Sequence, residues 1–155
     1  MITPKDFITI AEFLQDGDFC PRLIETPGEQ RLDGVVLQEE KHEAAGMVAR
    51  TYARASNIQF EHLQSLCVDK LKAVHPYTPT ALMSVVGLLS KRQRNDNDAE
   101  SELMRWMVDL LTENFWAVVR SDANITLERV MRGDPGLRQM VVEKLASDPG
   151  TGFQA

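Results

Sequence analysis

Apolar residues recur every three or four positions along most of the chain, which is the spacing of one face of an α-helix. This pattern predicts helices at about 4–15, 57–74, 79–91, 98–120, 124–132 and 135–146. Residues 27–55 also have a helical pattern, but Gly34, Gly46 and the apolar run at 35–37 leave its continuity open. We therefore expect an all-α fold of five to seven helices.

Four of the expected helix starts share one signal, a threonine or aspartate followed by proline. The signal occurs at Thr3-Pro4, Thr26-Pro27, Thr78-Pro79 and Asp134-Pro135. The side-chain oxygen can accept a hydrogen bond from a first-turn amide, and proline has no amide to leave unpaired. Thr26 with Glu29, and Asn97 with Glu100, also fit a capping box. These signals strengthen the prediction of a helical chain.

The pattern also predicts which side of the first helix packs and where the third helix begins and ends. The first helix carries Phe7, Ile10, Ala11 and Leu14 on one shared face. Asn57 is a candidate N-cap for the third helix, which we expect to stop before His75-Pro76.

The most apolar stretch is ELMRWMVDLLTENFWAVV, from Glu102 to Val119. A membrane-spanning helix needs about 20 residues with almost no charge. Arg105, Asp109 and Glu113 would be costly in lipid, so we expect no membrane span. A helix that is apolar over most of its circumference usually packs on several neighbours. We therefore predict a compact irregular bundle around a central helix at about 98–120.

Length and composition favour one globular domain. The 155 residues are 43% hydrophobic and 26% charged, and no low-complexity segment divides them. We predict a single helical domain at 1–147 and a flexible C-terminal tail at 148–155.

The net charge and the cysteines bear on which partners the protein binds and on where in the cell it is located. The net charge of −6 makes nucleic acid an unlikely partner, because binding to phosphate backbones requires clustered lysines and arginines. Cys20 and Cys67 form no CxxC pair, and the start of the chain lacks the pattern of a signal peptide. We therefore expect a cytoplasmic protein.

The candidate chemistry is sparse. Glu39 and His42 form an ExxH, the spacing that di-iron bundles use twice, but the chain has no second copy. The sequence QEEKHE around this pair is more typical of a solvated helix face. No GxSxG, HExxH, P-loop or GxGxxG motif is present. We predict no catalytic residue, no metal site and no cofactor.

One basic cluster, SKRQR at 90–94, follows a predicted helix. Cations are favoured at a helix C-terminus, and Asp96 and Asp98 come directly after the cluster. A charge-balanced exposed loop is the simplest interpretation. Contact with a phosphate or with an acidic partner is the alternative.

Met104, Trp106, Met107 and Trp116 are the candidate partner-binding residues on the fifth predicted helix. Methionine adapts to varied apolar partners, and large aromatic side chains dominate contact energy at interfaces. The same residues could instead fill the core, and the pattern leaves both interpretations open.

Two short stretches, SLCVDKL at 65–71 and ELMRWMVDLL at 102–111, resemble the phage Gam family of host-nuclease inhibitors. The resemblance covers less than a fifth of the chain, and the spacing of the stretches differs. No residue role is transferred from it.

These observations predict a non-enzymatic protein-interaction module, a small acidic helical adaptor, chaperone or inhibitor that binds another protein. One alternative is an acidic inhibitor or accessory factor of a DNA-processing enzyme. Another is a helical metal-dependent enzyme that uses Glu39 and His42. Homo-oligomerisation is left open.

Overall fold

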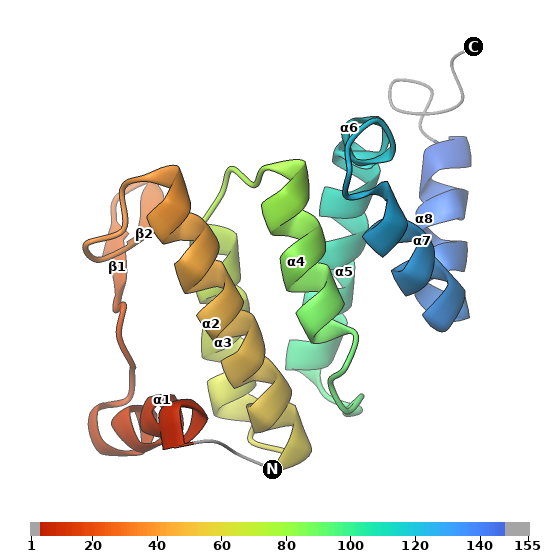
Figure 1. Ribbon diagram of the computed structural model, residues 1–155. Helices are drawn as coiled ribbons and strands as arrows, with labels where there is room; N and C mark the ends of the chain where they lie inside the picture. Colours follow the sequence, from red (N-terminus) through yellow and green to blue (C-terminus); the bar gives the residue numbers. More distant parts are fainter. Residues whose placement is uncertain (1–3, 148–155) are drawn as a thin grey trace.

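The computed structural model describes residues 4–147, with side chains from Phe7 onward (Figure 1). This part of the chain contains eight helices and one β-hairpin. The elements are α1 (Pro4–Asp16), β1 (Leu23–Thr26), β2 (Glu29–Leu32), α2 (Gln38–Asn57), α3 (Glu61–Ala73), α4 (Pro79–Leu89), α5 (Asp98–Glu113), α6 (Phe115–Val119), α7 (Asn124–Gly133) and α8 (Pro135–Ser147).

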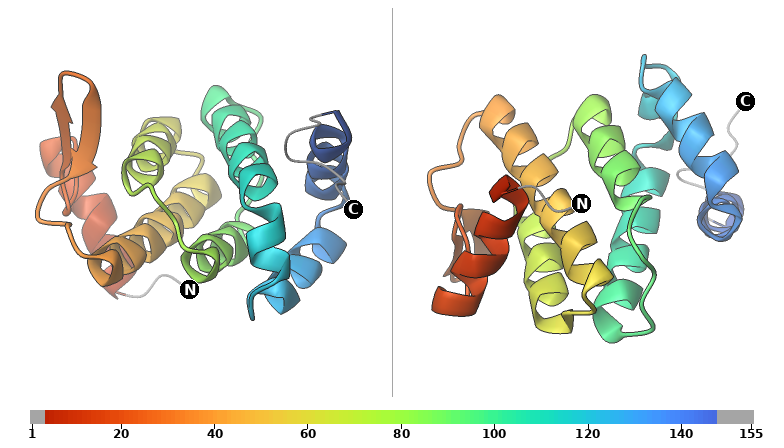
Figure 2. Two further views of the ribbon diagram at one scale, coloured as in Figure 1. Left: turned by 90° about the horizontal axis from the view of Figure 1, so that it is seen from above. Right: turned by 60° about the horizontal axis from the view of Figure 1, so that its bottom comes forward.

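The helices form a bundle that follows the chain from one end to the other. Helix α2 packs against α1, α3 and α4, and α5 packs against α3 and α8. The hairpin and α1 lie at one end, whereas α6, α7 and α8 lie at the other (Figures 1 and 2). The prediction of an all-α bundle is confirmed, and the central position expected for α5 is shared with α2.

One continuous apolar core joins the bundle. Its largest fully buried side chains include Tyr52, Leu63, Leu82, Leu103 and Leu111. They come from α2, α3, α4 and α5, so four helices bury apolar faces against one another. In the described part of the chain, no helix has both the length and the apolar character needed to cross a lipid bilayer.

Several predicted helix starts are confirmed by their caps. The Thr78 hydroxyl accepts a hydrogen bond from the Ala81 amide at 3.1 Å, and the Asn97 side chain accepts one from the Glu100 amide at 2.9 Å. Asp134 does the same for the amide of Leu137 in α8. Thr3 and the predicted tail at 148–155 lie outside the described residues.

The helix start predicted at Thr26-Pro27 is wrong, because these residues form the turn of the hairpin. Thr26 pairs with Glu29 across antiparallel strands, and Gly28 has φ +84. Glycine adopts this left-handed conformation without a steric penalty. The Thr26 hydroxyl donates to the Glu29 carbonyl and does not cap a helix. Helix α2 begins eleven residues after Pro27, at Gln38.

Two other helix ends differ from the prediction. Asn57 is the last residue of α2 and does not cap α3, because Gln59 adopts a left-handed φ of 57 before α3 begins at Glu61. The fifth predicted helix is divided at Asn114, whose side-chain amide donates to the Leu110 carbonyl at 2.9 Å. The Asn114 backbone amide also donates to the Leu110 carbonyl at 3.0 Å, so this carbonyl accepts two hydrogen bonds where α5 ends.

The apolar face predicted for α1 packs only in part, because Ile10 is buried and Ala11 is half-buried, but the other two residues of that face are not. Phe7 and Leu14 are 55% and 63% exposed, whereas Thr9 and Ile10 are buried. The hydroxyls of Thr9 and Thr51 share a hydrogen bond of 3.0 Å, which turns this side of α1 towards α2. Contact with α2 therefore buries Ile10 together with Thr9 and leaves Phe7 and Leu14 at the surface.

Candidate functional site

An open groove of about 960 Å³ lies between α4 and α7. Helix α4 supplies one wall and α7 the other, while the loop after α4 and the α7–α8 junction complete the lining. We call this the basic groove. The residues that line it are Arg50, Met83, Ser84, Gly87, Leu88, Ser90, Lys91, Arg94, Thr126, Arg129, Val130, Gly133, Asp134, Pro135 and Gly136.

Small residues line the groove along α4. Ser84 and Gly87 are three positions apart on one face of the helix, and Ser90, its C-cap, continues the row. A Cβ atom at Gly87 would lie 3.7 Å from Cγ2 of Thr126, so α7 approaches α4 closely at this point. The Thr126 side chain therefore faces Gly87 at this point.

The groove gathers positive charge in an acidic protein. Its cations are Arg50 from α2, Lys91 and Arg94 from the loop after α4, and Arg129 from α7. Asp134 is the acid among the described lining residues, and it pairs with Arg94. The side chains of Arg50, Lys91 and Arg129 make no ion pair or hydrogen bond with the described residues.

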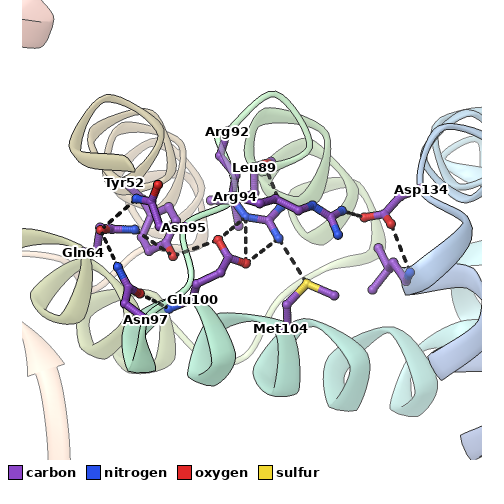
Figure 3. A network of polar contacts seen from close by, with 11 residues as sticks. Tyr52, Gln64, Leu89, Arg92, Arg94, Asn95, Asn97, Glu100, Met104 and Asp134 are labelled. Carbon is purple, nitrogen blue, oxygen red and sulfur yellow. Dashed lines mark hydrogen bonds and ion pairs between the residues drawn. The ribbon is translucent and has the colours of Figure 1, made fainter. Parts of the chain in front are cut away.

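A buried ion pair fixes the loop that carries Lys91 and Arg94. The Arg92 guanidinium donates to both carboxylate oxygens of Glu100, with Nη2 2.7 Å from Oε2 and Nε 2.8 Å from Oε1 (Figure 3). It also donates to the Leu89 carbonyl at the end of α4. The two charged side chains are only 1% and 9% exposed, so this pair is well shielded from water.

The other side of Glu100 is held by Tyr52. The Tyr52 hydroxyl donates to Glu100 Oε1 at 3.2 Å and accepts from the Gln64 amide at 3.3 Å. Burial, followed by the nearby Glu100 carboxylate, raises the pKa of Tyr52 above its ordinary value. The phenol therefore remains a neutral donor at physiological pH.

The far end of the loop is anchored to α2 and α3. The Asn95 side chain donates to the Ser56 carbonyl at 3.0 Å. It also donates to Gln64 Oε1 at 3.3 Å, as does the Asn97 side chain (Figure 3). Both ends of the segment 90–97 are therefore tied to the core, and Lys91 and Arg94 project from a fixed loop.

Asp134 connects this loop to the C-terminal helices. One carboxylate oxygen accepts from the Leu137 amide at 3.1 Å and caps α8, while the other pairs with Arg94 (Figure 3). A carboxylate is favoured at this position because the N-terminus of a helix carries partial positive charge.

The partner-binding residues predicted from the sequence do not form one surface. Met107 is 1% exposed and belongs to the core, and Trp106 is half-buried with its ring against Tyr77 at 5.8 Å. Trp116 is 37% exposed and meets the Phe115 ring edge to face. Met104 is half-buried beneath the Arg92 guanidinium and lines a shallower groove of about 390 Å³ between α5 and α8.

The residues considered for metal and thiol chemistry lie apart. Glu39 is exposed at the start of α2 and His42 is half-buried. The part of the chain that the structure describes holds no group of three histidine, cysteine, aspartate or glutamate side chains placed to bind a metal ion. Cys20 is exposed, whereas Cys67 is buried, and burial raises the pKa of its thiol.

Half of the cations in the basic groove had a signal in the sequence. Lys91 and Arg94 belong to the SKRQR cluster, for which contact with an acidic partner was one interpretation. Arg50 and Arg129 were missed, because each stands in an ordinary amphipathic helix and only the tertiary fold brings it to α4.

Comparison with known proteins gives no relative from which a role could be taken. No family model matches the chain, and neither a curated protein nor a solved structure resembles it significantly.

Proposed function

We propose that the protein is a non-enzymatic interaction module and that the basic groove is its docking surface for another protein. The observation that supports this proposal is the gathering of Arg50, Lys91 and Arg129, without ion-pair partners among the described residues, around one open groove.

A single exposed cation without a partner has little meaning, because water solvates it well. Several cations in one concavity repel one another, and the chain has an excess of six acidic over basic residues that could have neutralised them. Their grouping creates a local positive potential on a negative protein. Such complementary fields orient charged partners and select among them.

The described polar interior supports binding rather than catalysis. Arg92, Glu100, Tyr52 and Gln64 satisfy one another's hydrogen bonds, and no buried side-chain nitrogen or oxygen in the described residues lacks a partner. This network has a structural task, which is to hold the rim of the groove. The predictions of an adaptor, chaperone or inhibitor role and of a cytoplasmic location stay predictions.

The test is affinity capture from the native cell with a charge-reversed groove, Lys91→Glu with Arg129→Glu. A matched control carries Arg31→Glu with Lys41→Glu, which changes the net charge equally and lies at another groove of about 250 Å³ beside the hairpin. We expect the wild type and the control to capture the same protein and the groove variant to lose it. A set of captured proteins that is unchanged by the groove variant would contradict the proposal.

A second candidate function is supported by charge at the opposite end. Glu25, Glu29, Asp33, Glu39 and Glu40 are all exposed on the hairpin, on its connection to α2 and at the start of α2. An acidic inhibitor or accessory factor of a DNA-processing enzyme would present such a surface to a basic channel. In the capture experiment this candidate predicts loss of the partner when these acids become amides, with no effect of the groove variant.

A further inference from the structure

We infer that the basic groove takes a short, extended acidic segment of a partner protein, about four residues long, with an apolar side chain between its acids. This inference rests on the proposed function and specifies the chemistry of the partner.

The length of the segment follows from the geometry of α4. The lining residues of α4 and its C-cap run from Met83 to Ser90, seven helical steps of about 1.5 Å each, so this part of the floor is about 10 Å long and Lys91 extends it by one residue. An extended peptide rises about 3.3 Å per residue. About four residues therefore cover the floor.

The charge of the segment follows from the positions of the cations. Helix α4 lies between α2 and α7 (Figure 1), so Arg50 and Arg129 approach the groove from opposite sides of α4. Lys91 adds a third cation without an ion-pair partner among the described residues at the end of α4, where Arg94 is already paired with Asp134. A segment lying along α4 therefore meets positive charge on both flanks, and acidic side chains match it.

The central apolar side chain follows from the floor. Leu88 is half-buried and lines the groove, so it still presents apolar surface, whereas Met83 and Val130 beside it are buried in the core. Contact with Leu88 removes apolar surface from water, which is favourable. A long side chain is not needed to reach the floor at Ser84, which is small and exposed.

Nucleic acid fits these observations less well than an acidic peptide. None of the described residues that line the groove is aromatic, so no side chain in it can stack on a base. The net charge of −6 also opposes a long polyanion, whereas a segment of about four residues meets mainly the local field.

The inference is tested with two end-capped fluorescent tetrapeptides, Glu-Leu-Glu-Glu and its neutral counterpart Gln-Leu-Gln-Gln. Binding to the 155-residue chain is measured by fluorescence anisotropy at low and at physiological salt. We expect the acidic peptide to bind and to bind more weakly as salt increases, and the neutral peptide not to bind. Arg129→Glu should weaken binding at least about tenfold, since an exposed attraction becomes a repulsion, and Arg31→Glu should leave it unchanged.

Arg129→Gln provides a second variant that removes the charge without reversing it, and circular dichroism establishes that each variant is folded. Equal binding of both peptides would overturn the inference, and so would an oligodeoxynucleotide of equal charge that binds more tightly than the acidic peptide. If neither peptide binds but the captured protein still depends on Lys91 and Arg129, the inference fails and the proposed function stands. If that dependence is absent too, both fail.

Discussion

Replacing Glu100 by glutamine should destabilise the protein more than any exposed charge change. The substitution keeps an oxygen that can accept from Tyr52 but leaves the Arg92 guanidinium, 1% exposed, without a counterion. Removing one partner of a buried ion pair usually costs about 3–5 kcal/mol. Because the amide oxygen still accepts hydrogen bonds, we expect a loss of about 3 kcal/mol in the free energy of unfolding, the lower end of that range.

The revealing comparison is the double variant Glu100→Gln with Arg92→Met. Removing the second charge abolishes the uncompensated buried cation and adds apolar packing beside Met104. Well-packed apolar replacements of buried ion pairs are often neutral or stabilising. We therefore expect the double variant to be more stable than Glu100→Gln alone by about 1–2 kcal/mol.

Urea denaturation followed by circular dichroism measures these differences, with an unchanged m-value as the criterion for comparing midpoints. Glu128→Gln is the control, because the Arg132–Glu128 pair on α7 is 78% and 69% exposed and should contribute less than about 0.5 kcal/mol. A double variant less stable than either single variant, with losses that simply add, would refute the explanation based on an uncompensated buried charge.

Three further predictions concern the core and the thiols. Met107→Ala should cost about 2–5 kcal/mol because it opens a cavity in the core, whereas Trp116→Ala at the surface should cost under about 2 kcal/mol, as thermal unfolding will show. A thiol reagent should modify Cys20 in the native protein and Cys67 only after unfolding, because Cys67 is buried and burial raises the pKa of its thiol. Counting the modified thiols per chain with and without denaturant should give one and two. Lys70→Met should cost about 3 kcal/mol in a urea titration, because the buried ammonium pairs with a carboxylate and donates to two backbone carbonyls.

The sequence predicts well those helices whose starts are set by local chemistry. Thr78-Pro79 and Asn97 contain their own caps, so α4 and α5 begin where expected. The hairpin was missed although Pro27-Gly28 is a typical turn dipeptide, because the threonine before it gave an equally good helix-start signal. Choosing between them depends on whether β2 finds a partner strand, and that is a tertiary contact.

The candidate site was less predictable than the fold. The positive charge of SKRQR was visible, but the aspartates after it suggested neutralisation within the loop. In the structure, Asp96 and Asp98 are exposed and neither forms an ion pair with the described residues, while Glu100 turns inward to Arg92. The sequence shows which charges follow one another along the chain, but the ion-pair partner of each charge depends on the tertiary fold.

Asp134 both caps α8 and pairs with Arg94, so a ligand that contacts Arg94 would compete with Asp134 for this guanidinium. A partner carboxylate that reached Arg94 would displace Asp134 from this guanidinium, but Asp134 would keep its bond to the first turn of α8. The helix terminus would continue to favour the released charge. Docking at this end of the groove would therefore replace Asp134 by the partner's carboxylate at Arg94. Both carboxylates would still have a favourable contact, the partner's with Arg94 and that of Asp134 with the α8 N-terminus.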